Sequence, residues 1–239
     1  MIEPKDYLNE FKKYRKSMFE SHAKYVLRNY LNPWAKRIIE KNQFGNTDLS
    51  NECSSLIIDD RPNEMLRFSV INTLWMTKFK IPVNIYTTRK SLLPTKSLFL
   101  DIENNSNLIK IKTLEINEIS INSYNNLLKS DNFWGRLETK KILIFQTDSL
   151  LIEPIEMSMF DFDYIGAIFS KGKSRSIEFP YFNDGSLEEV GSVWVTQKYN
   201  ENLANGILMG NGGLSIRNRD IMKKICLEET SHHMENEDI

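Results

Sequence analysis

Two short polar segments follow runs of apolar residues and carry side chains that could bind a phosphorylated ligand. They are Asp-Asp-Arg-Pro at residues 59–62 and Gln-Thr-Asp-Ser at residues 146–149. Mg²⁺ and Mn²⁺ prefer oxygen ligands and commonly share them with substrate phosphates. Asp148 is therefore a candidate metal ligand, and Gln146 lies on the same side of an extended chain because it is two residues away. The alternative is that Asp148 caps a helix or forms a turn.

The segment around Asp59 has two interpretations. In the first, the Asp59 carboxylate accepts hydrogen bonds from a ribose or base, and Arg61 faces a phosphate. In the second, the two residues form a structural ion pair where a strand turns into a helix. The residue types alone are compatible with both, so both stay open at this point.

Two later segments are further candidates. Asn-Gly inside Gly210-Asn-Gly-Gly213, between two apolar runs, predicts a tight hairpin, and its glycines would let the backbone approach a ligand closely. The acidic pair Glu237-Asp238 could supply a carboxylate base, or could be an ordinary solvated terminus. His232 and His233 are either metal ligands or exposed side chains of a polar tail.

The elements that would position these residues follow from periodicity. Buried-type or alternating runs predict strands, and apolar residues at helical spacing predict helices between them. Such alternation is typical of an α/β fold with right-handed crossovers and a largely parallel sheet. Residues 170–205 show no clear period and are interpreted as a functional loop. The predicted strands are 55–59, 83–87, 108–114, 141–145 and 163–168, and the predicted helices are 63–78, 122–129 and 220–229.

The first 42 residues differ from the rest in charge. They contain ten Lys or Arg against five Asp or Glu, a net +5, which leaves −6 for the remainder of a chain with net charge −1. Tyr7, Phe11, Tyr14, Met18 and Tyr25 recur at helical spacing, and Asn-Pro at 32–33 ends that helix and starts a shorter one. We expect a basic helical extension over residues 1–50 and one α/β domain over 51–239. The helix either packs on that domain with a solvated basic face or contacts an anionic membrane surface or a partner.

Composition excludes several classes of protein. A balance of 31 basic and 32 acidic residues argues against a general nucleic-acid binder. Cys53 and Cys226 match no metal or disulfide spacing. No signal peptide or membrane span is evident, so the expected location is cytoplasmic. The phosphate-loop, dinucleotide and nucleophile-elbow motifs do not occur, which lowers the odds of those enzyme classes.

Taken in order, four motifs resemble a glycosyltransferase-like domain-of-unknown-function family. They are F-Q-T-D-S at 145–149, D-Y-I-G-A at 163–167, G-N-G-G-L-S-I-R at 210–217 and E-D at 237–238, within a resemblance that spans roughly residues 54–239. The resemblance implies a GT-A nucleotide-sugar transferase, with a Rossmann-like mixed, mainly parallel sheet. In that comparison Asp148 is the metal ligand, and Gln146 replaces the first acid of the D-x-D motif.

The same resemblance implies roles for the remaining site residues. Asn211, Gly212 and Gly213 would line the donor and acceptor sugars, together with Asp59, Arg61, Gln146 and Asp148 at the donor. Asp238 or Glu237 would be the base of an inverting enzyme. The chain stops one residue after this pair, whereas GT-A domains generally continue; a truncation, compensation by His232 or His233, or a weakened relative would each account for that.

The expected function is therefore transfer of a sugar from a UDP- or GDP-sugar to the hydroxyl of a glycan or other acceptor, assisted by Mn²⁺ or Mg²⁺. The alternative is a protein of another functional class: a catalytically weak or inactive nucleotide-sugar or glycan-binding module that acts as a scaffold in glycan assembly. The missing first acid and the abrupt end of the chain motivate that alternative.

Overall fold

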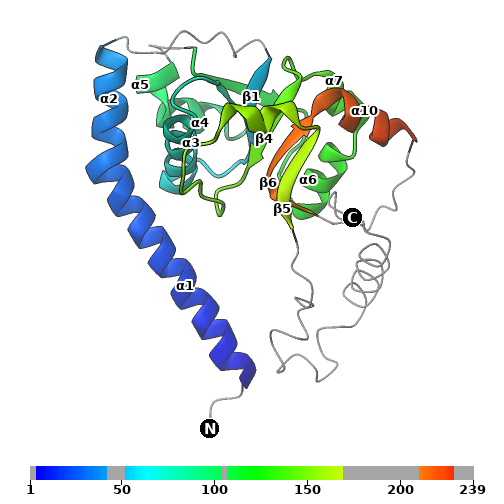
Figure 1. Cartoon of the computed structure of the whole chain (residues 1–239). Coiled ribbons are helices and arrows are strands. Elements are labelled where there is room, and N and C mark those ends of the chain that lie inside the picture. The colour runs from blue at the N-terminus through cyan, green and yellow to red at the C-terminus, as the bar shows by residue number, and fades with distance from the viewer. Residues whose placement is uncertain (1–3, 42–51, 104–106, 169–209, 229–239) are drawn as a thin grey trace.

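The protein is a mixed α/β structure with an N-terminal helical extension (Figure 1). The computed structural model describes residues 4–41, 52–103, 107–168 and 210–228. Its six-stranded sheet has the order β3-β2-β1-β4-β6-β5. The strands are β1 (Cys53–Ile58), β2 (Val83–Thr88), β3 (Ile109–Leu114), β4 (Lys141–Phe145), β5 (Tyr164–Ile168) and β6 (Gly210–Asn218). The predicted fold class is confirmed.

Four of the strands are parallel and form the half of the sheet that matters most for ligand binding. β1 pairs in parallel with β2 on one side and with β4 on the other, and β2 pairs in parallel with β3. The chain thus proceeds outward from β1 to β3 and returns to the opposite side of β1 for β4. Ligands of open α/β sheets collect at the carboxyl ends of strands where the strand order reverses in this way. That point lies between β1 and β4.

Helices cover both faces of the sheet because successive residues of each buried strand point to opposite sides. On one face, Ile57 and Ile85 pack with α3 (Glu64–Met76) and the N-terminal helices. On the other face, Leu56 and Ile144 pack against a second group of helices. This second group consists of α6 (Ile121–Leu128), α7 (Asp131–Gly135) and α10 (Arg219–Glu228). The short helices α4 (Leu92–Leu98) and α5 (Leu100–Glu103) lie between β2 and β3 in the chain, and η3 (Met157–Asp161) precedes β5.

Residue Asn63 explains why α3 begins where it does. Its side chain accepts hydrogen bonds from the backbone N–H groups of Met65 and Leu66, at 2.9 and 3.1 Å, which satisfies two of the donors left open at a helix start. Most of the helix between Leu66 and Leu74 is buried, and it ends at Met76, before two residues with positive φ, Lys78 and Phe79. The sequence prediction extended this helix two residues too far.

The N-terminal extension is a long helix that continues through a wider turn. α1 (Pro4–Val26) passes into the π-helical turn η1 (Leu27–Leu31) and then into α2 (Asn32–Glu40). Pro33 has no N–H to donate, so it is tolerated at the start of α2. The predicted pair of helices is confirmed, although they run on without a break.

A different face of the extension from the predicted aromatic stripe contacts the body. Ala23, Leu27, Leu31 and Ala35 are buried and join the core around α3. All described residues from 9 to 18 are exposed, and the blue end of α1 projects beyond the sheet (Figure 1). The extension therefore does pack on the domain, but only through its second half.

The predicted hairpin at Gly210–Gly213 is wrong. These residues form the first part of β6, a single strand that pairs antiparallel with both β4 and β5. The pairing with β5 shifts register between Gly166 and Ala167, whose partners in β6 are Ser215 and Asn211, so the ladder is irregular there. Glycine and asparagine that suit a turn also suit an irregular strand, and only the presence of β5 as a partner decides between the two.

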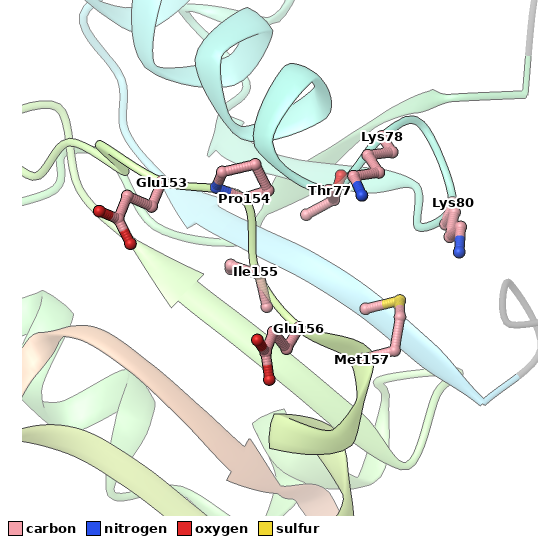
Figure 2. A pocket seen from close by; sticks show the side chains of 8 residues that line it. All are labelled: Thr77, Lys78, Lys80, Glu153, Pro154, Ile155, Glu156 and Met157. Atoms are coloured by element: carbon pink, nitrogen blue, oxygen red, sulfur yellow. The ribbon is translucent and has the colours of Figure 1, made fainter.

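A smaller hollow lies at the opposite end of the sheet from the switch point. It has a volume of about 520 Å³ and is formed by the segment after α3 and by residues 153–157 (Figure 2). The backbone N–H of Ile155 donates to the carbonyl of Met76 at 3.0 Å and joins the two segments. Two lysines, Lys78 and Lys80, lie across it from Glu153 and Glu156, so its charges are mixed.

Candidate functional site

The two predicted polar segments meet at the carboxyl ends of β1 and β4. The strands are hydrogen-bonded neighbours in parallel register, with Leu56 opposite Ile144, so the residues that follow them leave the sheet side by side. Arg61 connects the segments directly, because its Nη2 donates to Thr147 Oγ1 at 3.3 Å. The contact brings the two segments to one edge of the sheet, while the roles predicted for their side chains stay predictions.

Asp59 is held by Arg61 through three hydrogen bonds. Its carboxylate is 3% exposed and accepts from the Arg61 backbone N–H at 2.7 Å, from Nε at 3.1 Å and from Nη2 at 2.6 Å. The hydrogen bonds that Arg61 donates to Asp59 raise the pKa of the Arg61 guanidinium above its ordinary value. The Arg61 side chain is itself 69% exposed. Arg61 thus neutralises and orients the buried Asp59 carboxylate, while the Arg61 guanidinium remains accessible from the cleft.

The neighbouring Asp60 has a purely structural environment. Its carboxylate accepts the backbone N–H of Ile119 at 2.9 Å, and its carbonyl accepts the Ser91 hydroxyl at 2.6 Å. These bonds fix the loop that leads into α6, whose first turn is capped by Ser120. The three consecutive residues Asp59, Asp60 and Arg61 thereby anchor the end of β1 on two sides.

A tight turn after β4 presents Asp148. Ser149 closes this turn: its hydroxyl accepts the Gln146 N–H at 2.8 Å and donates to the Gln146 carbonyl at 2.8 Å. From α3, the Ser69 hydroxyl approaches the Thr147 carbonyl at 3.4 Å, and Asn72 exchanges two hydrogen bonds with the backbone of Leu151. The turn is therefore held from both sides.

The Asp148 side chain itself is exposed and borders the cleft. In the described part of the chain, no hydrogen bond or ion pair engages its carboxylate, so it caps no described helix. Its charge acts on Arg61 through space and contributes to the raised pKa of that guanidinium. Gln146, two residues earlier, is half-buried and lines the same cleft.

Strand β6 brings its glycines to the same edge. The Gly213 carbonyl lies 3.3 Å from the Ser149 hydroxyl, and Gly213 lines the cleft next to Asp148. Asn211 pairs with Ala167 of β5, and Gly212 follows it in β6, but their side-chain environments lie outside the described residues. The structure therefore places Gly213 at the site and leaves the contacts of the other two untested.

These residues surround a cleft of about 1330 Å³. Its floor is formed by the ends of β1 and β4, and α6 contributes Tyr124 and Asn125 together with its capping residue Ser120. That volume is larger than the 300–1,000 Å³ typical of small-molecule pockets, so it is large enough for an extended ligand.

The wall opposite the sheet comes from α1, which the sequence did not assign to the site. Lys12, Arg15 and Lys16 line the cleft from this helix. With Arg61 they give four cationic side chains, against Glu20, Asp59 and Asp148 as anions. Two of these cations are paired with anions of the site: Arg61 with Asp59, and Lys16 with Glu20 at 3.9 Å. The charges within each pair cancel. The signal in the sequence was the +5 charge of residues 1–42, but charge alone does not say which surface a helix faces.

The donor set at this edge fits a divalent cation that arrives with a phosphate. In the described residues no three acidic, His or Cys side chains gather as a ready-made metal cage. Asp148 supplies one open carboxylate and Gln146 an amide oxygen nearby. Mg²⁺ commonly binds through one or two carboxylates plus substrate phosphates and keeps several waters. The residues present therefore fit such an ion only in company with a phosphorylated ligand.

Several predicted site residues fall outside the part of the chain that is described. These are the acidic pair Glu237 and Asp238, and the histidines His232 and His233. Residues 170–205, the segment interpreted as a functional loop, also lie outside the described part of the chain. Their proposed roles remain predictions.

Comparison with known proteins gives a family and distant similarities to solved structures. A family model described as a protein of unknown function (DUF5672) matches residues 108–239, more than half of the chain, and the chain belongs to that family. A search of curated proteins found no match. Among solved structures, the chain is similar to the mannosyltransferase Ktr4p from S. cerevisiae in complex with GDP. That similarity has a TM-score of 0.42 and 10% sequence identity, and covers 82% of this chain and 68% of the other.

Proposed function

We propose that this member of the DUF5672 family is a metal-assisted glycosyltransferase that moves a sugar from a nucleotide-diphosphate sugar to an acceptor hydroxyl. One observation carries the proposal: an open carboxylate, Asp148, borders a large cleft at the switch point of a mainly parallel sheet. The four motifs that resemble glycosyltransferases support it, since three of them contribute residues to β4, β5 and β6.

In this proposal the diphosphate lies between the ends of β1 and β4. Arg61, fixed by Asp59 and still exposed, would hydrogen-bond a phosphate oxygen. Lys12 and Arg15 of α1 would add positive charge from the opposite wall. Asp148 and Gln146 would hold Mn²⁺ or Mg²⁺ against the same phosphates. When bound, that ion supplies Lewis-acid stabilisation of the charge that develops on the departing nucleotide diphosphate.

The second chemical requirement is a base for the acceptor hydroxyl. We assign it to Asp238, or to Glu237 beside it, on the strength of the resemblance alone. Removal of the hydroxyl proton as the oxygen attacks the anomeric carbon would give inversion, and such general-base help is worth roughly 10²–10⁴-fold. The sugar, the nucleotide base and the acceptor are not assigned.

A non-catalytic nucleotide-sugar or glycan-binding module is the second candidate. The observation that favours it is the sparse set of metal ligands, because Gln146 is uncharged and, among the described residues, Asp59 is already bound to Arg61. A neutral amide binds a divalent cation less strongly than a carboxylate does. The two candidates share the binding step and differ in turnover.

Calorimetric titration with GDP and UDP, with and without Mn²⁺, tests the binding step. We expect Mn²⁺ alone to bind weakly and nucleotide affinity to rise at least about tenfold with the ion. Asp148→Asn should remove this metal dependence while leaving the weak metal-free binding in place. Glu153→Gln, in the hollow at the other end of the sheet, is the matched control and should behave as the unaltered protein does. Equal metal dependence in both variants would refute the role of Asp148.

Turnover decides between the two candidates. A panel of UDP- and GDP-sugars is incubated with the protein, and release of nucleotide diphosphate is measured. Sustained release that Asp238→Asn abolishes, with nucleotide binding intact, supports the transferase. Metal-dependent binding without any release or transfer across the panel supports the binding module instead.

A further inference from the structure

One face of α1 carries a row of large apolar side chains that are about half exposed or more, and one of them, Met18, also borders the cleft. Phe11, Tyr14, Met18 and Tyr25 are 46%, 62%, 54% and 55% exposed. They are separated by three, four and seven residues, so they share one side of the helix. We call these four residues the outer stripe. They lie on the side of α1 away from Ala23 and Leu27, which pack into the core.

The helix that bears the outer stripe is also strongly basic. Residues 9–18, all exposed, contain four Lys or Arg and one Glu. This concentration of positive charge contrasts with the −6 of the chain after residue 42. The end of α1 that carries it projects past the sheet, where a broad surface could approach it (Figure 1).

We infer that α1 docks on an anionic lipid surface through the outer stripe. Aromatic and Met side chains with one polar or polarisable part suit the boundary between lipid head groups and acyl chains. Lys13 and Lys24 have long aliphatic stems that can extend along the helix and place their ammonium groups among lipid phosphates. No described helix is both long enough and apolar enough to cross a bilayer, so the contact would be with the surface.

Charge complementarity favours lipid over a second copy of this chain. Two basic α1 helices that met along their outer stripes would bring like charges together. Several acidic side chains of the described body are already paired with cations, so these side chains would not attract the α1 helix of a second copy. These pairs are Glu64 with Arg28, Asp101 with Arg67, Glu115 with Arg89, and Glu138 with Lys110 and Lys112.

Vesicle co-sedimentation of the full chain tests this inference. We expect binding to phosphatidylcholine vesicles that contain phosphatidylserine, little binding to phosphatidylcholine alone, and loss of binding near 1 M salt, where charges are screened within about 3 Å. Combined Phe11→Ser, Tyr14→Ser and Tyr25→Ser, the outer-stripe variant, leaves the cleft lining unchanged and should weaken binding at least about 100-fold. Combined Lys13→Gln and Lys24→Gln should weaken it about 30-fold, from roughly fivefold for each cation near an anionic surface.

The matched control removes equally exposed apolar side chains elsewhere. Leu93 and Ile152 are 76% and 80% exposed, and their combined replacement by Ser should leave vesicle binding unchanged. Circular dichroism would verify that each variant is folded. Three results would overturn the inference: no binding to anionic vesicles, equal loss in the control, or a dimer in sedimentation that the outer-stripe variant converts to monomer. GDP and UDP titration of the outer-stripe variant keeps this test separate from that of the proposed function.

Discussion

Replacing Arg61 with alanine should destabilise the fold far more than its exposure suggests. The substitution removes two of the three hydrogen bonds to Asp59, at 2.6 and 3.1 Å, and leaves only the backbone N–H at 2.7 Å. An unpaired buried carboxylate costs about 3–5 kcal/mol. Because the Arg61 side chain is 69% exposed, water would enter where it was and recover part of that cost. We therefore expect a loss of about 3 kcal/mol in the free energy of unfolding, at the lower end of that range.

Arg89 provides the matched control for this substitution. Its Nη2 lies 2.6 Å from Glu115, the same separation as in the Arg61–Asp59 pair, but Glu115 is 67% exposed whereas Asp59 is 3% exposed. Exposed pairs contribute about 0–1 kcal/mol, so Arg89→Ala should cost about 0.5 kcal/mol. The two variants thus compare a buried with an exposed carboxylate at the same shortest N···O distance, although the Arg61 side chain makes two hydrogen bonds and that of Arg89 makes one.

Urea unfolding followed by tryptophan fluorescence measures the difference. With a slope of about 3 kcal/mol per M for a chain of this size, Arg61→Ala should lower the midpoint by about 1 M and Arg89→Ala by about 0.2 M. Adding Asp59→Asn to Arg61→Ala should restore part of the stability, because an amide needs no cation. Equal midpoints for the two arginine variants would show that Asp59 does not depend on Arg61, and the reasoning would fail.

Two further predictions concern titratable groups. Burial raises the pKa of Cys53 to about 11. Iodoacetamide at pH 8 should therefore label Cys53 only in unfolded protein. Peptide mass spectrometry measures the labelling, and rapid labelling of the native protein would contradict the prediction. Hydrogen bonds from Lys112 and Lys110 lower the pKa of Glu138 to about 2, so its stabilisation is present above the unfolded-state value of about 4.3 and is lost as pH falls towards 2. Glu138→Gln should therefore cost about 0.5 kcal/mol at pH 7, a small value because the carboxylate is 56% exposed, and almost nothing at pH 2, as urea unfolding at both pH values would reveal.

Local patterns predicted the frame of the fold because they depend on local physics. The buried runs at β1, β2 and β4, and the helix capped by Asn63, are fixed by residue type and spacing within a short window. Polar residues that directly follow two parallel strands leave the sheet at the same edge, and Asp59, Arg61 and Asp148 all line the cleft there.

The sequence-based predictions were wrong where a local pattern is compatible with two structures and contact with a distant segment decides between them. Gly210–Gly213 suits either a turn or an irregular strand, and pairing with β5 selects the strand. The stripe from Phe11 to Tyr25 was compatible with packing on the body, yet Ala23 and Leu27 make that contact instead. Helical spacing identifies an apolar face but does not identify what the face touches.

The sequence by itself determined the layered α/β frame, the strand ends that carry the polar residues and the basic character of α1. Tertiary structure alone decided that Asp59 is held by Arg61 and that Asp148 stays open. It also decided that α1 turns three cations towards the cleft while Phe11, Tyr14 and Tyr25 stay exposed outside the cleft lining. The physical reason is the range of the interactions. Periodicity and capping act over a few residues, whereas the partner of a charge or the cover of an apolar face is set by segments brought together only when the chain has folded.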